Sequence, residues 1–117
     1  MAKKSNTEPL VFVNNETGET VTIEFNRRVI LRMEKEGFGG EALADSMKTA
    51  PISSVVELFY YGMLMHQPET TLDDATDFFF DNVGVDTGII EHLTDLYAKP
   101  YEDMLTAQRK NSRWTVK

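Results

Sequence analysis

The longest nearly uncharged stretch of the chain predicts a helix that is buried on several sides. Residues 51–67 read PISSVVELFYYGMLMHQ and contain a single charge, Glu57. In a helix, Ser53, Glu57 and Tyr61 share one narrow strip at i, i+4 spacing, and apolar side chains cover nearly all of the rest. Such a helix needs cover on several sides, and in a small chain part of that cover can come from another molecule.

Two β-rich runs near the start of the chain predict a hairpin. They cover about residues 10–14 and 20–25, and the loop between them contains Gly18, which is free to take a positive φ angle. In the second run apolar and polar residues alternate from Val21 to Phe25, so one face seeks a core. A two-stranded hairpin is marginal by itself, and we therefore expect this one to pack on helices.

The next part of the chain predicts helices with recognisable ends. Asn26 offers an N-cap for the first helix, and Gly37 is the glycine typical of a helix stop. Residues 41–47 are expected to form a short turn of helix. The nearly uncharged helix follows, with Pro51 suited to its first turn and with Gln67 and the following proline at its end.

Further helices are predicted beyond residue 70. Thr71 and Asp74 resemble a capping box that opens a helix running to Gly84. Its expected apolar stripe comprises Leu72, Ala75, Phe78, Phe79 and Val83. Asp86 is a suitable cap for another helix. Pro100 either ends this helix or starts a short last helix. The fold class is therefore mainly α, with four to five helices preceded by an N-terminal β-hairpin.

Length and charge divide the chain into an acidic body and a basic end. A length of 117 residues fits one domain, and we assign residues 1–108 to a single helical domain that includes the hairpin. Residues 109–117 carry basic side chains and no acid, which predicts a basic flexible tail. Residues 69–103, in contrast, hold ten acids against Lys99 alone. The net charge of −7 disfavours nucleic acid as a partner.

The residues that usually carry catalysis are sparse, so we predict that the protein is not an enzyme. The chain has no cysteine, which removes thiol nucleophiles and cysteine-rich zinc sites. His66 and His92 fall on separate predicted helices without metal-binding spacing. Asp73, Asp77 and Asp81 share a predicted helix face but lack the calcium-loop pattern. We expect no catalytic residue, no cofactor and no metal ion.

The hydropathy pattern also bears on location. No run approaches the roughly 20 apolar residues of a membrane span, since Glu57 and His66 interrupt the best candidate. The first residues, MAKKSNTEPL, lack the apolar stretch of a secretion signal. We therefore expect a cytoplasmic protein without membrane contacts.

Protein binding remains as the candidate activity, and the nearly uncharged helix is its candidate site. Phe, Tyr and Met are enriched at interfaces, and Met adapts to varied apolar partners. The simpler interpretation is a central helix covered by the hairpin and the other helices. The alternative hypothesis is that one side stays open for a partner. The candidate protein-binding residues are Phe59, Tyr60, Met63, Leu64 and Met65.

Three segments of the chain carry a family resemblance. They are the strand leading into VTIEFNRRVILRMEKEGF, the apolar LFYYGMLMHQPETTLDDATDFFFDNV and the later LTDLYAKPYEDML, and they span about residues 10–105. In their order and spacing they resemble the small tail assembly chaperones of long-tailed bacteriophages, in particular those of phages and prophages of Gram-positive bacteria. The tail, QRKNSRWTVK, is not part of this pattern.

The resemblance implies a helical homo-oligomeric protein that binds the long, aggregation-prone tape measure protein. Such a chaperone keeps its client soluble and supports assembly of the tail tube in the bacterial host cytoplasm, and it is absent from the mature virion. Under the same resemblance, this chain is expected to correspond to the short form. In many such phages a frameshifted long form recruits the tail tube protein.

Two other classes of function stay open at the level of sequence. One is an acidic DNA mimic that inhibits a host nuclease through the carboxylates Asp73, Asp74, Asp77 and Asp81. The other is a structural tail or connector subunit, which would be found in purified virions. A DNA mimic binds a basic enzyme in a salt-sensitive way, whereas a chaperone for an apolar helical client tolerates salt.

Overall fold

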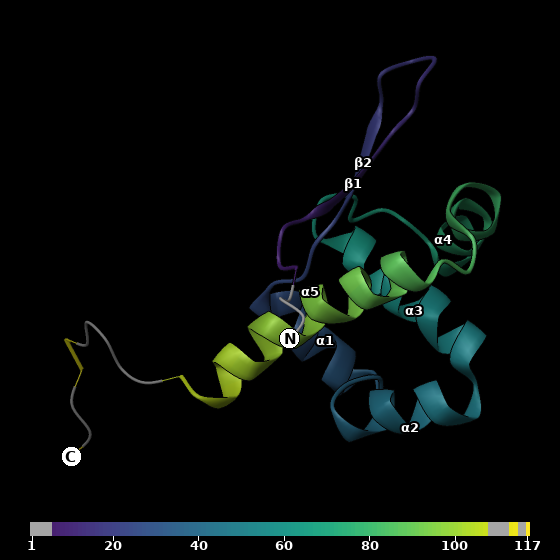
Figure 1. The fold of residues 1–117 in the computed structure, drawn as a ribbon. Coiled ribbons are helices and arrows are strands. Elements are labelled where there is room, and N and C mark those ends of the chain that lie inside the picture. Colours follow the sequence, from purple (N-terminus) through teal and green to yellow (C-terminus); the bar gives the residue numbers. More distant parts are fainter. Residues whose placement is uncertain (1–5, 108–112, 115–116) are drawn as a thin grey trace, which may run out of the picture.

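The computed structural model describes residues 6–107, 113, 114 and 117. Over these residues a two-stranded antiparallel hairpin precedes five α-helices and one π-helical turn (Figure 1). The elements are β1 (Leu10–Val13), β2 (Thr20–Ile23), α1 (Arg27–Lys35), α2 (Glu41–Thr49), α3 (Pro51–Leu64), α4 (Leu72–Phe78), η1 (Phe79–Val83) and α5 (Thr87–Leu105). The predicted fold class is confirmed. Most of the predicted basic tail, residues 109–112, 115 and 116, lies outside the described residues.

The caps predicted at Asn26 and Thr71 and the glycine stop predicted at Gly37 are confirmed in their atomic detail, whereas α3 ends at Leu64, before the predicted stop at Gln67. The Asn26 side chain accepts a hydrogen bond from the Val29 amide at 2.9 Å, and Gly37 follows α1 with a φ of 82°. At the start of α4, Thr71 and Asp74 form a reciprocal capping box, with bonds of 3.1 and 3.3 Å between each side chain and the other residue's amide. These local signals fix where the helices begin and end.

Pro100 lies inside α5, so the prediction that it ends one helix or starts another is wrong. A proline in a helix removes one hydrogen bond to the carbonyl four residues earlier and crowds that carbonyl. Here the buried side chains Leu96 and Tyr97 precede it, and the partly buried Tyr101 and Met104 follow it. Because the core holds the helix on both sides of Pro100, the loss of one backbone bond does not break it.

A second difference is the π-helical turn η1, where a continuous α-helix is predicted. Three successive phenylalanines meet at the junction of α4 and η1: Phe78 is partly buried, Phe79 is buried and Phe80 is exposed. Gly84 ends the turn with a φ of 74°, and its amide donates to the Phe79 carbonyl at 2.8 Å. Short π turns are rare and occur often at functional sites.

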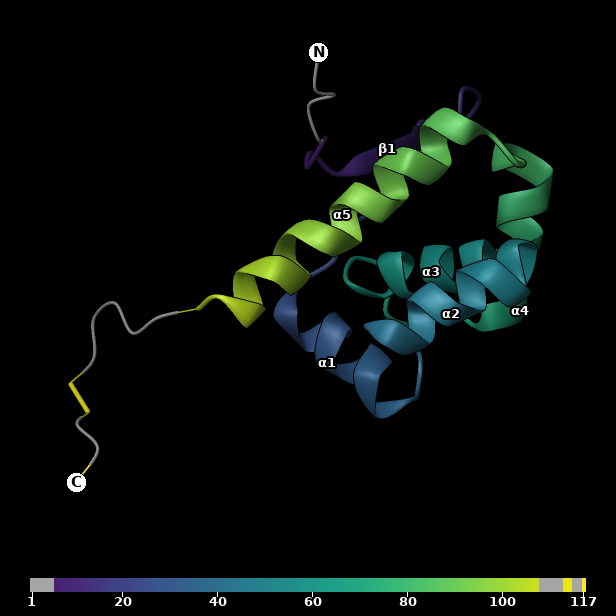
Figure 2. The ribbon, with the colours of Figure 1, turned by 60° about the horizontal axis from the view of Figure 1, so that its bottom comes forward.

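Helix α3 lies at the centre of the fold, in contact with β2, α1, α2, α4 and α5 (Figures 1 and 2). The closest approach is at Gly62. The Glu24 amide donates to the Gly62 carbonyl at 3.0 Å, and a Cβ atom at Gly62 would lie only 2.5 Å from Cγ2 of the buried Ile23. The hairpin therefore packs directly on the helix backbone, as the alternation of its second strand predicts.

The side chain of Gln67 extends this contact. Its amide group exchanges two hydrogen bonds of 2.9 Å with the backbone N–H and carbonyl of Thr22, as a neighbouring strand would. The same nitrogen donates to the Met63 carbonyl in the last turn of α3 at 2.7 Å. One side chain thus bonds backbone groups of both β2 and α3, and the Met63 carbonyl also accepts from the Gln67 backbone amide at 2.8 Å.

The predicted polar strip of α3 is exposed at only one of its three positions. Ser53 is exposed and Glu57 is partly buried, whereas the ring of Tyr61 is buried. The Tyr61 hydroxyl donates to Glu36 at 2.7 Å, and Arg32 donates to the other oxygen of the same carboxylate at 2.7 Å. The bond from Tyr61 is the main cause that lowers the pKa of Glu36, and burial raises the pKa of Tyr61.

Replacing Gly62 by alanine tests the contact between β2 and α3. Gly→Ala inside a helix normally stabilises a protein by about 1 kcal/mol. Here we expect the opposite sign, a loss of about 1–3 kcal/mol, because the new methyl group overlaps Ile23. Urea unfolding measures the change, and Ser53→Ala, at an exposed position of α3, is the control with an expected effect within about 0.5 kcal/mol. A more stable Gly62→Ala protein would contradict the close contact.

Replacing Tyr61 by phenylalanine tests the network around Glu36. The ionised Glu36 stabilises the fold above the pKa that it has in the unfolded chain, and this stabilisation is lost as the pH falls through its lower folded pKa. Without the Tyr61 hydroxyl we expect the pKa of Glu36 to rise toward its ordinary value. An NMR titration of the Glu36 carboxyl measures it. Tyr60→Phe is the control, since the Tyr60 hydroxyl bonds Arg32 and not Glu36. An unchanged pKa in Tyr61→Phe would contradict the assignment.

Candidate functional site

The structure places the predicted protein-binding residues in two environments. Phe59, Met63 and Leu64 are buried in the core, and Tyr60 and Met65 are partly exposed. The ring of Phe59 packs on Phe12, Phe78 and Phe79 with centroid distances of 6.0, 6.0 and 5.4 Å. The buried three are fully engaged within the chain, so Tyr60 and Met65 are the members of this set that a partner can reach in the folded protein.

An exposed apolar surface that the sequence did not single out lies at the other end of α3. Four large apolar side chains gather there with high exposed fractions: Ile52 57%, Leu72 45%, Phe80 52% and Val85 68%. They come from the starts of α3 and α4, from η1 and from the loop before α5. They border two hollows that share Ile52. We call these four residues and the residues that line the two hollows the Ile52 surface.

The first hollow lies between the start of α3, η1 and the start of α5. It has a volume of about 80 Å³ and is lined only by the apolar residues Pro51, Ile52, Val55, Phe79, Val85 and Ile90. An apolar recess of this size matches part of a single side chain. Water gains little there because the lining offers no side-chain hydrogen-bond partner.

The second hollow lies between α3 and the α4–η1 segment. Its volume is about 280 Å³, and its lining residues are Ile52, Ser53, Val56, Glu57, Leu72, Thr76 and Phe80. Small-molecule pockets are typically about 300–1,000 Å³ and enclose most of their ligand. This smaller, open hollow suits one large protruding side chain better.

Glu57 is the charged residue that lines the second hollow. Burial is the main cause that raises the pKa of its carboxyl group, and repulsion by Glu36 adds to the effect. Both causes disfavour the ionised form in the isolated molecule. A cation brought to this hollow by a partner would offset them.

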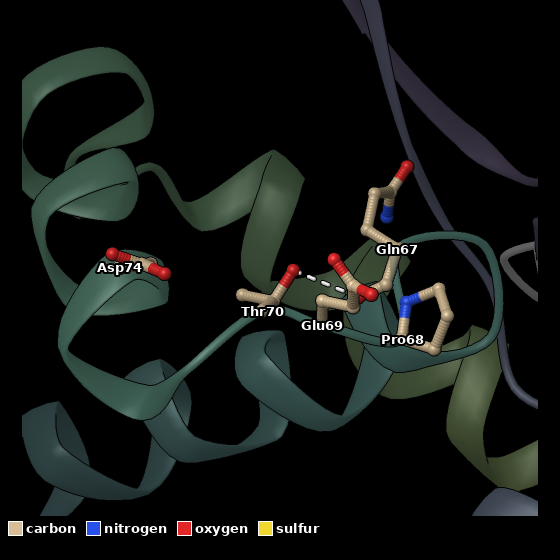
Figure 3. A pocket seen from close by; sticks show the side chains of 5 residues that line it. All are labelled: Gln67, Pro68, Glu69, Thr70 and Asp74. Carbon is tan, nitrogen blue, oxygen red and sulfur yellow. Dashed lines mark hydrogen bonds between the residues drawn. The ribbon is translucent and has the colours of Figure 1, made fainter.

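A third hollow, of about 440 Å³, lies at the connection between α3 and α4 (Figure 3). Several of its polar groups serve the fold. Gln67 binds β2, the Thr70 hydroxyl donates to the Gln67 carbonyl at 2.8 Å, and Asp74 belongs to the capping box of α4. This hollow is therefore a by-product of the turn and offers few free groups to a ligand.

The two histidines considered as metal ligands contact other groups of the chain instead. His66 lies 2.7 Å from Glu24, and His92 lies 2.6 Å from the carbonyl of Glu8, so each histidine contacts the N-terminal part of the chain. Within residues 6–107, 113, 114 and 117, no group of three His, Asp or Glu side chains is placed to hold a metal ion. In the same part of the chain, no helix combines the length and the apolar character needed to cross a membrane.

The sequence contained weak signals for the Ile52 surface. Three consecutive phenylalanines, Phe78 to Phe80, cannot all face one side of a helix, so one of them was bound to point outward. Val85 stands alone between Gly84 and Asp86, in a loop without periodicity. Leu72 belongs to the predicted apolar stripe, but it is exposed in the structure, where it lies in the first turn of α4.

These features define a small, mainly α-helical domain with an N-terminal hairpin and an exposed apolar surface. The chain belongs to the family described as Domain of unknown function (DUF5055), whose model matches residues 1–117. No curated protein and no solved structure matches the chain.

The two environments of the predicted residues can be separated by substitution. We expect Met63→Asp to unfold the protein, because a buried carboxylate costs more than the about 2–5 kcal/mol typical of Met→Ala in a core. Tyr60→Asp should leave the fold intact, since its side chain reaches solvent. Circular dichroism during heating checks both variants. A stable Met63→Asp protein would show that Met63 is not a core residue.

Proposed function

We propose that this protein is a tail assembly chaperone of a long-tailed phage or prophage. In this role it binds the tape measure protein, keeps it soluble and supports assembly of the tail tube in the host cytoplasm. The observation that carries the proposal is the Ile52 surface, which gathers exposed apolar side chains around two hollows. The choice of the tape measure protein as the client comes from the resemblance of the hairpin and helix segments to tail assembly chaperones.

The surface suits recognition of a helical client. An amphipathic helix places apolar side chains into a groove at i, i+3, i+4 and i+7. Two adjacent hollows on either side of Ile52 give such side chains separate places to insert. The large apolar residues at the rim add contact area without an energetic cost to the fold, since they are already exposed.

The charge of the molecule supports the same role. A client that aggregates is kept in solution more easily by a partner that carries net charge, and this chain carries −7. Several copies bound along one long client would add avidity to modest single contacts. The proposed short form therefore works as one of many copies, and a frameshifted long form would recruit the tail tube protein.

The Ile52 surface favours a chaperone over an acidic DNA mimic. A mimic needs carboxylates that are free to meet a basic enzyme over a continuous face. Of the four carboxylates assigned to a mimic, Asp74 is bound in the capping box of α4. A mimic has no use for the neighbouring exposed Leu72 and Phe80, which lie on the same α4–η1 segment as its proposed acids.

Co-expression with a phage tape measure protein tests the proposal. We expect the wild-type chain to raise the soluble fraction of the client and to co-purify with it. Ile52→Asp and Phe80→Asp should abolish both effects while the variants stay folded, because each places a charge where an apolar contact forms. Leu31→Asp is the matched control, since Leu31 is 55% exposed but lies on α1.

The outcomes test the chaperone function and the assignment of the Ile52 surface separately. No gain in solubility with the wild-type chain would overturn the chaperone proposal. A gain that survives Ile52→Asp and Phe80→Asp would keep the chaperone and overturn the assignment of its surface. The complex should persist at about 1 M salt, where the Debye length is about 3 Å, whereas a complex between an acidic mimic and a basic enzyme would dissociate.

A further inference from the structure

A carboxylate without a partner lies in the hollow between α3 and the α4–η1 segment. Glu57 lines this hollow and is partly buried. Within the part of the chain that the structure describes, its side chain forms no hydrogen bond and no ion pair. Its oxygens nevertheless stay accessible, and the neighbouring charge that acts on it is the repulsive one of Glu36. A carboxylate in these surroundings favours the approach of a cation.

The walls of this hollow supply no cation of their own. From residue 49 to residue 98 the chain contains no lysine and no arginine, and both walls come from this stretch. Arg32, on α1, is held by the carboxylate of Glu36 at 2.7 Å. A cation for Glu57 therefore has to be brought to the hollow from outside its walls.

A row of aspartates runs along the rim of the same hollow. The lining residues of the α4–η1 wall recur at every fourth position: Leu72, Thr76 and Phe80. An exposed aspartate directly follows each of them: Asp73, Asp77 and Asp81. Within the described residues these three carboxylates have no hydrogen bond and no ion pair. Because α4 turns its opposite side to the core through the buried Ala75, the aspartates stand on the solvent side of the hollow.

The spacing along α3 defines what a ligand helix has to present. Glu57 follows Ile52 by five residues, a rise of about 7.5 Å along the helix axis. On a ligand helix, residues three or four positions apart lie on one face and about 4.5–6 Å apart along the axis. The long stem of a lysine or arginine covers the remaining distance and packs its methylene groups on apolar surface.

We propose that the Ile52 surface selects helices that carry a lysine or arginine one turn away from a large apolar residue, with the apolar side chain against Ile52 and Phe80 and the cation on Glu57. This inference rests on the proposed function, because it names the chemistry of the client segment that binds. The apolar contact holds the complex at high salt, and the pair with Glu57 selects among apolar helices. The aspartates of the rim speed the encounter with a basic client at low salt.

Two synthetic helical peptides with the same apolar face test the proposal on the full chain. One peptide carries lysine one turn away from each apolar anchor, and the other carries glutamine at the same positions. Fluorescence anisotropy of the labelled peptides measures both dissociation constants. We expect the wild type to bind the lysine peptide about tenfold more tightly or better, the gain typical of a hydrogen bond between charged groups.

Glu57→Gln should remove this preference, so that both peptides bind as the glutamine peptide binds to the wild type. The variant should fold at least as well as the wild type, because it removes a partly buried charge without a partner. Circular dichroism during heating checks this. Glu102→Gln is the matched control: it removes the same charge from an exposed position late in α5 and should keep the preference.

The rim is tested by a double variant, Asp73→Asn with Asp77→Asn. It should slow the association of the lysine peptide at low salt and leave its dissociation rate nearly unchanged, because exposed charges act mainly on the encounter. Stopped-flow mixing measures both rates. An association rate equal to that of the wild type would overturn the role of the rim.

Equal binding of the two peptides by the wild type would overturn the proposal, and so would a preference that survives Glu57→Gln. Failure of both peptides to bind would overturn it as well. The chaperone function has a separate measurement, the solubility of the co-expressed client. A client that Glu57→Gln keeps in solution as well as the wild type does would overturn the proposal and leave the chaperone function standing.

Discussion

The close contact between Gly62 and Ile23 is the constraint on which the rest of the structure depends. Because α3 has no side chain at this position, the end of β2 lies on the helix backbone, and the Glu24 amide bonds the Gly62 carbonyl. Gln67 then ties Thr22 to the last turn of the helix. The hairpin is marginal by itself, so these contacts are what make it part of the fold and bring Phe12 onto the Phe59 ring.

This arrangement covers the two ends of α3 to different degrees. The hairpin, α1 and the phenylalanines of α4 and η1 cover its later turns, which contain most of its large apolar residues. Its first turns have less cover, and Ile52 stays exposed beside Leu72 and Phe80. A helix that is apolar on almost every side is thus buried along most of its length and leaves Ile52 uncovered in its first turn.

The sequence predicted what local chemistry determines. The caps at Asn26 and Thr71, the glycine stop at Gly37 and the alternation in β2 each follow from a few neighbouring residues, and each is confirmed. The continuation of α5 through Pro100 could not be predicted, because it depends on packing of side chains far away in sequence. The apolar surface was missed for a similar reason. Composition pointed to α3, but the exposed side of a helix is decided by what its neighbours leave uncovered.

The π turn gives the chain a marker that can be followed through its family. A π turn arises when one extra residue is accommodated in an α-helix, and each residue turns an α-helix by about 100°. In relatives that are one residue shorter between Ala75 and Gly84, this turn would be an ordinary α-helix. The position of Phe80 would then be rotated about the helix axis, away from Ile52. A single-residue difference in length at this point would therefore separate relatives that keep the exposed phenylalanine from relatives that have lost it.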